Sequence, residues 1–189
     1  MVNQLSELSS LIKFRLINSV STFINSNDWI WIITLFIIFS LVGIPLGFKL
    51  GLLRFEIAKI SCKILLRTAL ITLIIPVAAE EAFFRVLLLP NKVEQASLVT
   101  NWLWGSISLI LFVVYHPLNA TFFIRNARAT FNSFAFLTLA AILGIVCTIA
   151  YLKSGSIYPP VILHWVFVLG WLMGLGGYRR LHNQASSSD

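Results

Sequence analysis

The sequence predicts an all-α fold: a polytopic transmembrane helix bundle of about five spanning helices, plus an N-terminal interfacial helix. Composition is the first reason. The 189 residues are 58% hydrophobic and 11% charged, with a mean hydropathy of +0.89, whereas soluble domains are about 25% charged. The second reason is that the apolar residues form runs of about 20, the length that crosses roughly 30 Å of hydrocarbon. These runs occupy roughly half of the chain and leave no room for a separate soluble domain.

The charged residues and the cysteines exclude several classes of protein. The net charge of +7 does not predict nucleic-acid binding, because most of the 14 basic residues stand singly between apolar runs, as in the loops of membrane proteins. Cys62 and Cys147 lie far apart without metal-ligand spacing, so we expect packing roles for them. No small-residue cleavage pattern follows the first long apolar run, which begins near Trp29, so a cleavable signal peptide is not expected.

We divide the chain into an N-terminal segment (1–28), an integral helical domain (29–177) and a polar C-terminal tail (178–189). Apolar residues near helical spacing in the first segment predict an amphipathic helix that lies in the membrane interface: Leu5, Leu8, Ile12, Leu16 and Phe23. A frayed tail is the alternative for this segment.

The five spans are expected at residues 29–49, 64–89, 98–115 and 134–152, and from Pro159 to the glycines at 174–177. Asn27 and Asp28 can cap the first span. The third can continue past His116 and Pro117 as a kinked helix as far as Ile124.

Two pairs of small residues predict where helices pack most closely. Ala140 with Gly144, and Gly170 with Gly174, are each four residues apart, a spacing that lets two helix backbones approach. We interpret both pairs as packing positions without a further role.

The basic residues also predict the orientation in the membrane. With five spans, one side carries four of them (Lys13, Arg15, Lys92, Lys153) and the other carries nine (Lys49, Arg54, Lys59, Lys63, Arg67, Arg125, Arg128, Arg179, Arg180). The positive-inside rule then places the second side and the C-terminus in the cytoplasm, with the N-terminus outside. A sixth span formed by the N-terminal helix would move the N-terminus inside.

Glu80, Glu81 and Arg85 fall inside the second span. A charge near the bilayer centre costs about 2.5 to 3.5 kcal/mol on insertion scales, so such residues are functional candidates. Glu81 and Arg85 share a helix face and can pair, whereas Glu80 is rotated about 100° away and needs a partner on another helix. The histidines within spans are His116 and His164. A carboxylate beside an imidazole in a dry bundle can act as a general base that activates water.

Two other interpretations of these residues stay open. In the first, they are structural: a bundle-fixing ion pair and two satisfied core histidines. In the second, two histidines and a glutamate bind a catalytic zinc, although no HExxH motif is present. The catalytic interpretation also needs a tilt or kink. A third span centred near Leu111 puts His116 about 7 to 8 Å beyond the midplane on the cytoplasmic side, with Glu80 and His164 on the opposite side.

Three motifs occur in order within the apolar spans. Residues 80–85, Glu-Glu-Ala-Phe-Phe-Arg, match EExxxR; residues 112–116, Phe-Val-Val-Tyr-His, match FxxxH; and His164 opens a third motif of the form HxxxB. Together they resemble the CPBP family of intramembrane proteases, also called the Abi family. This family includes type II CAAX prenyl proteases and bacterial bacteriocin-processing enzymes. The resemblance covers a motif core of about residues 65–172.

The resemblance implies a glutamate-dependent endopeptidase that cleaves peptide bonds within or beside the bilayer. It implies that Glu80 activates the attacking water together with His116, and that His164 stabilises the developing oxyanion. Glu81 and Arg85 match the second acid and the arginine of the first motif, and the helix geometry makes them a supporting pair.

One position departs from the family pattern. The fourth residue after His164 is usually polar in the third motif, and here it is Val168, which cannot donate a hydrogen bond. The loss of one oxyanion donor typically costs about 100- to 1,000-fold in rate. Asn119, three residues after His116, is a candidate substitute, and a helix-end role is the alternative for it.

We therefore expect an intramembrane endopeptidase that processes CAAX-type substrates or leader peptides by glutamate- and histidine-activated water. A non-catalytic membrane scaffold or chaperone with a degenerate site is the alternative. A proton-coupled transporter would also need buried acids and histidines, but five spans without an inverted repeat do not match that architecture. The expected partners are the lipid bilayer and a membrane-associated peptide or protein substrate, with no nucleic acid. No cofactor is expected, with zinc as the open alternative. We expect a multi-pass protein of the cell (inner) membrane of a prokaryote.

Overall fold

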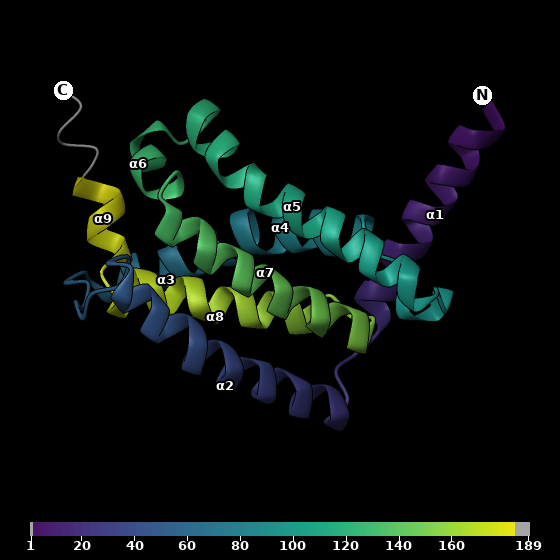
Figure 1. The fold of residues 1–189 in the computed structure, drawn as a ribbon, viewed down its shortest axis with the longest axis horizontal. Coiled ribbons are helices and arrows are strands. Elements are labelled where there is room, and N and C mark those ends of the chain that lie inside the picture. Colours follow the sequence, from purple (N-terminus) through teal and green to yellow (C-terminus); the bar gives the residue numbers. More distant parts are fainter. Residues whose placement is uncertain (1, 184–189) are drawn as a thin grey trace.

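The computed structural model describes residues 2–183 as an all-α bundle (Figure 1). In chain order the elements are α1 (Val2–Ser21), α2 (Ser26–Lys49), α3 (Cys62–Thr72), η1 (Leu73–Ala78), α4 (Ala79–Glu81), η2 (Ala82–Leu87), η3 (Lys92–Glu94), α5 (Leu98–Phe122), η4 (Arg125–Ala127), α6 (Arg128–Phe131), α7 (Phe134–Ser154), α8 (Tyr158–Gly174) and α9 (Gly177–Asn183). Within this described range the one strand-like feature is an isolated bridge between Glu56 and Leu175. The predicted fold class is confirmed.

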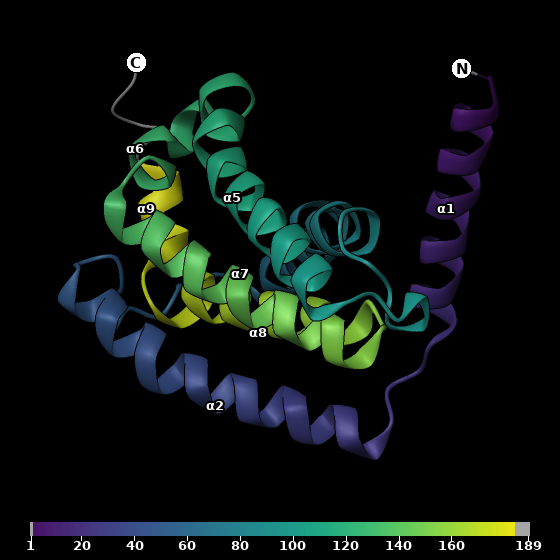
Figure 2. The ribbon, with the colours of Figure 1, turned by 45° about the vertical axis from the view of Figure 1, so that its right-hand side comes forward.

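Four helical segments of the described chain are long and apolar enough to cross a membrane: α2, residues 62–94, α5 and α7. The expected fifth span, α8, is an apolar helix of 17 residues, about 25 Å at 1.5 Å per residue. Prolines in its first turn and the glycines that follow it set this shorter length. The described residues therefore contain four candidate spans of full length and one shorter apolar helix. α8 runs along α7 (Figures 1 and 2).

Two helix boundaries differ from the sequence prediction. α2 begins at Ser26 and its N-cap is Asn25, not Asn27. The Asn25 side chain accepts a hydrogen bond from the Asp28 N–H, and Asp28 accepts one from the Asn25 N–H in return, which forms a capping box. α5 continues through His116 and Pro117 to Phe122, so the longer of the two predicted forms of this helix is present.

The second span is not a uniform α-helix. Two π-helical segments, η1 with Pro76 inside it and η2 with Arg85, enclose the single α-turn α4. Proline lacks the N–H that donates the backbone hydrogen bond in an α-helix. The wider π-helical turn accommodates this missing hydrogen bond. Inside η2, the Phe84 carbonyl accepts a hydrogen bond from the Ser108 hydroxyl on α5. Short π-helical turns are frequent at functional sites, and here they place both glutamates between them.

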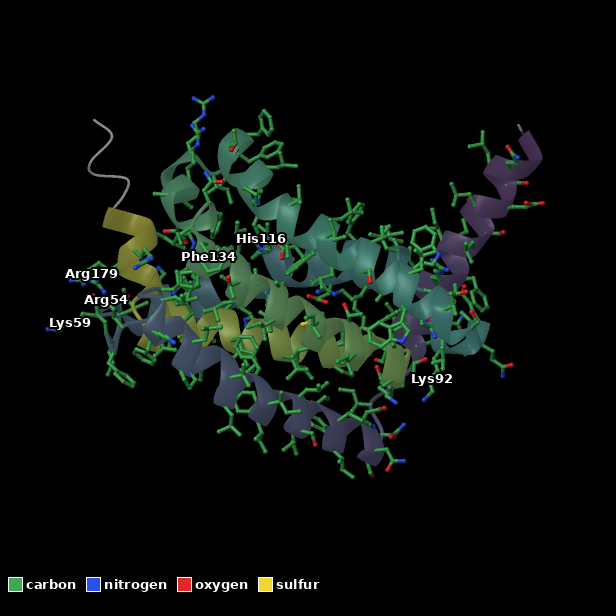
Figure 3. The ribbon with its side chains drawn as sticks, in the orientation of Figure 1. Arg54, Lys59, Lys92, His116, Phe134 and Arg179 are labelled. Carbon is green, nitrogen blue, oxygen red and sulfur yellow. The ribbon has the colours of Figure 1, made fainter. Side chains whose placement is uncertain are left out.

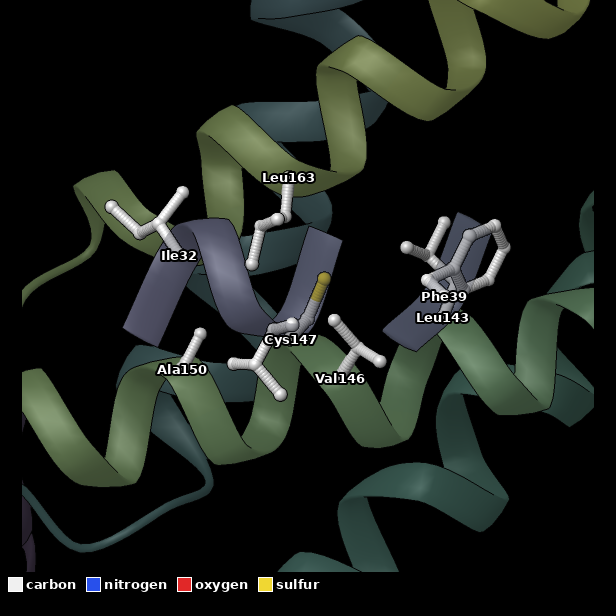
Figure 4. Packing of buried hydrophobic residues seen from close by; sticks show 8 residues of the cluster. Ile32, Phe39, Leu143, Val146, Cys147, Ala150 and Leu163 are labelled. Atoms are coloured by element: carbon white, nitrogen blue, oxygen red, sulfur yellow. The ribbon is translucent and has the colours of Figure 1, made fainter. Parts of the chain in front are cut away.

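The hydrophobic core lies where α2, α7 and α8 meet (Figure 4). Its buried residues are Ile32, Leu35, Phe39, Leu143, Val146, Cys147, Ala150 and Leu163. Cys147 is fully buried in this cluster, which confirms the packing role predicted for it. Cys62, in contrast, is an exposed free thiol, so the packing role predicted for it is wrong.

One of the two predicted small-residue pairs marks a close contact. A Cβ added at Gly144 would lie 2.7 Å from Leu109 Cδ1 and 3.1 Å from Phe112 Cδ1, so glycine lets α7 approach α5. A Cβ at Gly170 or Gly174 would meet nothing within 4 Å in the described chain. The prediction for the second pair is therefore wrong, because no described atom lies close to where a side chain at either position would point.

α1 is a helix that diverges from the bundle (Figure 2), so the frayed-tail alternative is wrong. Its C-terminal half is attached to the bundle by polar contacts. Arg15 Nε lies 2.7 Å from Glu94 Oε1, and the Ser19 hydroxyl lies 2.9 Å from the Tyr151 hydroxyl. Most of its apolar side chains are exposed, as an interfacial helix requires.

The chain after α8 turns back as α9, which covers the first residues of the predicted polar tail. Residues 184–189 lie outside the described residues. An extended segment before α3 runs beside this turn: the Glu56 N–H donates to the Gly174 carbonyl at 3.1 Å, and Arg179 Nη2 lies 2.7 Å from Glu56 Oε2.

Several basic residues outside the buried network lie at two opposite ends of the bundle. Figure 3 shows Arg54, Lys59 and Arg179 at one end and Lys92 at the other. Arg15, through its ion pair with Glu94 in η3, belongs to the Lys92 end. The grouping agrees with the predicted topology, and the orientation relative to the cytoplasm stays a prediction.

Candidate active site

One cavity of ≈ 240 Å³ gathers the three residues expected to be catalytic. Glu80 reaches it from α4, His116 from α5 and His164 from α8. All three are buried, and most of the other lining residues are apolar. The height difference expected between His116 and the other two does not keep them apart, because the helices are inclined to one another in the bundle (Figure 1).

Glu81 is the centre of the buried polar network beside this cavity. Its Oε2 lies 3.2 Å from Arg85 Nε, and both side chains are fully buried, so the predicted ion pair is present. Its Oε1 accepts a hydrogen bond from His164 Nδ1 at 2.7 Å. Sequence reasoning missed this second contact. The two residues are 83 positions apart, and no local spacing indicates the pairing.

Three groups contact the buried Arg85 guanidinium. Besides Glu81, its Nη2 donates to the Gly144 carbonyl at 3.1 Å, and its guanidinium lies 4.4 Å from the centroid of the Phe112 ring. A buried charge is tolerated when it is paired and hydrogen-bonded, and an aromatic face adds a favourable cation–π contact. Gly144 thus contributes a carbonyl to the network as well as close packing, a role that the sequence did not indicate.

Glu80 finds the cross-helix partner that its position on the helix requires. Its Oε2 lies 3.9 Å from His164 Nε2, which is beyond hydrogen-bond distance but within range of a charge interaction. Because the Glu81 carboxylate can only accept, His164 Nδ1 carries the proton of that hydrogen bond. The Nε2 atom is therefore the nitrogen that faces Glu80.

His116 is oriented by its own helix. Its Nδ1 donates to the Phe112 carbonyl at 2.8 Å, because a carbonyl oxygen can only accept. In the neutral ring, Nε2 is then a hydrogen-bond acceptor. The Phe112 ring stands nearly perpendicular to the rings of His116 and His164, with centroids 4.8 and 5.9 Å away. The described residues contain no hydrogen bond between Glu80 and His116.

Asn119 and Val168 both line the cavity. The Asn119 backbone carbonyl accepts hydrogen bonds from the N–H groups of Phe123 and Ile124 at the end of α5. Its side chain is therefore available to the cavity while its backbone closes the helix. Val168 presents an apolar side chain one turn after His164.

The zinc alternative finds no ligand group among the side chains that the structure describes, since no three His, Cys, Asp or Glu side chains there form a group that could hold a metal ion. The Nδ1 atoms of His164 and His116 are bonded to Glu81 and to the Phe112 carbonyl. Nε2 is therefore the free nitrogen of each ring, as it also is in many metal-binding histidines.

The fold and the cavity define a class: an integral membrane helix bundle with a buried glutamate–arginine–histidine network. Residues 61–170 match the profile of the type II CAAX prenyl endopeptidase Rce1-like family, and this match covers more than half of the chain. The chain belongs to this family, in agreement with the resemblance carried by its motifs. No curated protein and no solved structure matches the chain. The matched segment includes every candidate site residue and leaves out α1, α2 and α9.

Proposed function

We propose that the protein is an intramembrane endopeptidase that hydrolyses peptide bonds of membrane-associated peptides or proteins, of the CAAX type or in leader-peptide processing. One observation carries the proposal: Glu80, His116 and His164, from three elements, line a single cavity in a chain of the type II CAAX prenyl endopeptidase Rce1-like family. The proposed setting is a prokaryotic inner membrane, with the bilayer and the substrate as partners.

Glu80 and His116 activate the attacking water in this mechanism. The Glu80 carboxylate takes one proton from water. The His116 Nε2 lone pair accepts a hydrogen bond from the other O–H of that water, which keeps its proton. The resulting hydroxide attacks the scissile carbonyl carbon, and the proton held by Glu80 passes to the nitrogen of the leaving amine.

His164 stabilises the oxyanion. Its Nδ1–H is bonded to the Glu81 carboxylate, which fixes the orientation of the ring, and with a second proton the ring donates Nε2–H to the developing negative charge. Arg85 balances the charge of the Glu81 carboxylate through their ion pair. Asn119 is the proposed second donor, because its side chain lines the same cavity.

A non-catalytic scaffold or chaperone is the second candidate function. Val168 favours it, because an apolar side chain lines the cavity where the third family motif usually carries a polar one. In this alternative the protein keeps the fold and its ability to bind membrane peptides but hydrolyses none of them.

The proposal is tested by mass spectrometry of peptides after incubation with the purified, reconstituted protein. Farnesylated and unprenylated CAAX peptides are compared for wild type, Glu80→Gln and Glu7→Gln. Glu7 is the matched control, because it is an exposed carboxylate on α1 far from the cavity. Cleavage by wild type and Glu7→Gln but not by Glu80→Gln supports the protease and its base. Equal cleavage by all three contradicts the role of Glu80, and cleavage by none favours the scaffold.

A further inference from the structure

A buried hydroxyl group joins α5 to the backbone of the second span. Ser108 on α5 is fully buried, and its hydroxyl donates a hydrogen bond to the Phe84 carbonyl in η2 at 2.5 Å. Hydroxyl groups on helices often bond to the carbonyl four residues earlier in their own helix, and Thr121, Thr138 and Ser154 do so here. Ser108 instead donates to a neighbouring span, so the geometry of its own helix does not account for this contact.

The Phe84 carbonyl takes its donor from α5 because of the π-helical turn around it. A helical carbonyl accepts from the N–H four residues later in an α-helix and five residues later in a π-helix. For Phe84 these are the N–H groups of Leu88 and Leu89, and both donate to the Arg85 carbonyl instead. A buried carbonyl left without a donor destabilises the fold. The Ser108 hydroxyl supplies the donor and thereby stabilises the widened turn.

The widened turn sets the direction of the two acidic side chains that precede it. η2 follows α4 without a break, and Glu81 is its N-cap residue. Each residue of an α-helix corresponds to a rotation of about 100°, so a change of one residue in the register of η2 would turn Glu80 and Glu81 to a different side relative to the residues that follow. The 3.9 Å contact between Glu80 Oε2 and His164 Nε2 belongs to the observed register.

One face of α5 carries Ser108 together with two residues of the site. Ser108, Phe112 and His116 are spaced four residues apart, so they lie on the same face of the helix. The Phe112 ring centroid lies 4.4 Å from the Arg85 guanidinium. His116 lines the cavity, whereas Ser108 does not, and eight residues of helix separate the two by about 12 Å. Ser108 therefore affects the site through the backbone to which it is bonded and not by contact with the reacting atoms.

We infer that Ser108 is a positioning residue for the proposed reaction: its hydrogen bond to the Phe84 carbonyl holds η2 in the register that directs Glu80 toward His164. This inference rests on the proposed function. The same bond joins the second span to α5, so it also fixes the relative position of Glu80 and His116, which these two helices supply. Loss of such a residue slows the chemical step more than it weakens substrate binding.

The test measures kcat and KM separately, with a farnesylated CAAX peptide and the purified, reconstituted protein. Ser108→Ala removes the hydroxyl, and Ser106→Ala is the matched control, because Ser106 is an exposed residue of the same helix. Ser108→Ala is expected to lower kcat by about 10- to 100-fold, since a misplacement of about 1 Å can cost this much, with KM nearly unchanged. Ser106→Ala is expected to keep both parameters. An unchanged kcat for Ser108→Ala, or a rise in KM at constant kcat, overturns the inference.

A second variant separates positioning from general destabilisation. Ser108→Thr keeps a hydroxyl at this position and is expected to recover most of the kcat that Ser108→Ala loses. All rates are measured well below the melting temperature of each variant, so that unfolding does not lower kcat. A kcat for Ser108→Thr as low as that for Ser108→Ala overturns the inference. A wild type that cleaves no peptide refutes the protease and this role together, whereas cleavage that Ser108→Ala leaves unaffected refutes the role of Ser108 alone.

Discussion

At the scale of single residues, Glu81 is the group on which the buried network depends. It lies between Arg85 and His164 and is fully buried. Glu81→Ala is therefore expected to lower stability by about 3 to 5 kcal/mol, because it leaves the buried Arg85 guanidinium uncompensated. Glu80→Ala is expected to cost about 1 kcal/mol, since its contact with His164 is 3.9 Å long and its loss leaves the Glu81–Arg85 ion pair intact. Thermal unfolding in detergent measures both, and equal melting temperatures would contradict this division of roles.

A substitution at Val168 tests whether the site lacks a hydrogen-bond donor to the oxyanion. If the apolar side chain limits the rate, Val168→Asn is expected to raise cleavage by up to about 100- to 1,000-fold. Val166→Asn is the control, because Val166 is an exposed residue on the same helix. A gain at position 168 alone identifies an impaired protease. No change at either position argues that residue 168 does not contact the reacting carbonyl.

At the scale of elements, the contact of α5 with α7 sets the position of Arg85. Gly144→Ala places a methyl group 2.7 Å from Leu109 and 3.3 Å from Arg85 Nη2, so it is expected to destabilise the protein by about 1 to 3 kcal/mol. Gly170→Ala, whose methyl group meets nothing within 4 Å in the described chain, is expected to be neutral or stabilising by up to about 1 kcal/mol. The free energies of unfolding of the two variants in detergent are compared with that of the wild type. A destabilised Gly170→Ala beside a normal Gly144→Ala would refute this packing.

At the scale of the whole molecule, the two ends of the bundle should lie on opposite sides of the membrane. The end with nine basic residues is predicted to be cytoplasmic. In a Cys62→Ser background, an impermeant maleimide is expected to label Lys92→Cys in intact cells and Lys59→Cys only after permeabilisation. Cys147 is fully buried and gives no background. The reverse pattern would show that the orientation is inverted.

The composition and the hydrophobic runs were enough to predict an all-α membrane bundle, because spanning helices need long apolar segments whatever their neighbours are. The candidate residues could also be predicted from local information. A charged residue inside an apolar run stands out, and the four-residue spacing of Glu81 and Arg85 shows their pairing directly. The longer form of α5 and the buried Cys147 belong to the same group of local predictions.

Only the tertiary structure decided the rest, because it depends on contacts between residues far apart in the chain. The hydrogen bond from His164 to Glu81 and the Gly144 carbonyl at Arg85 have no signature in sequence spacing. The π-helical turns around α4 shift side chains away from the angles that α-helical counting assumes. Helix inclination brought His116 to the same cavity as Glu80, because a count of residues along one helix carries no information about how that helix crosses its neighbours.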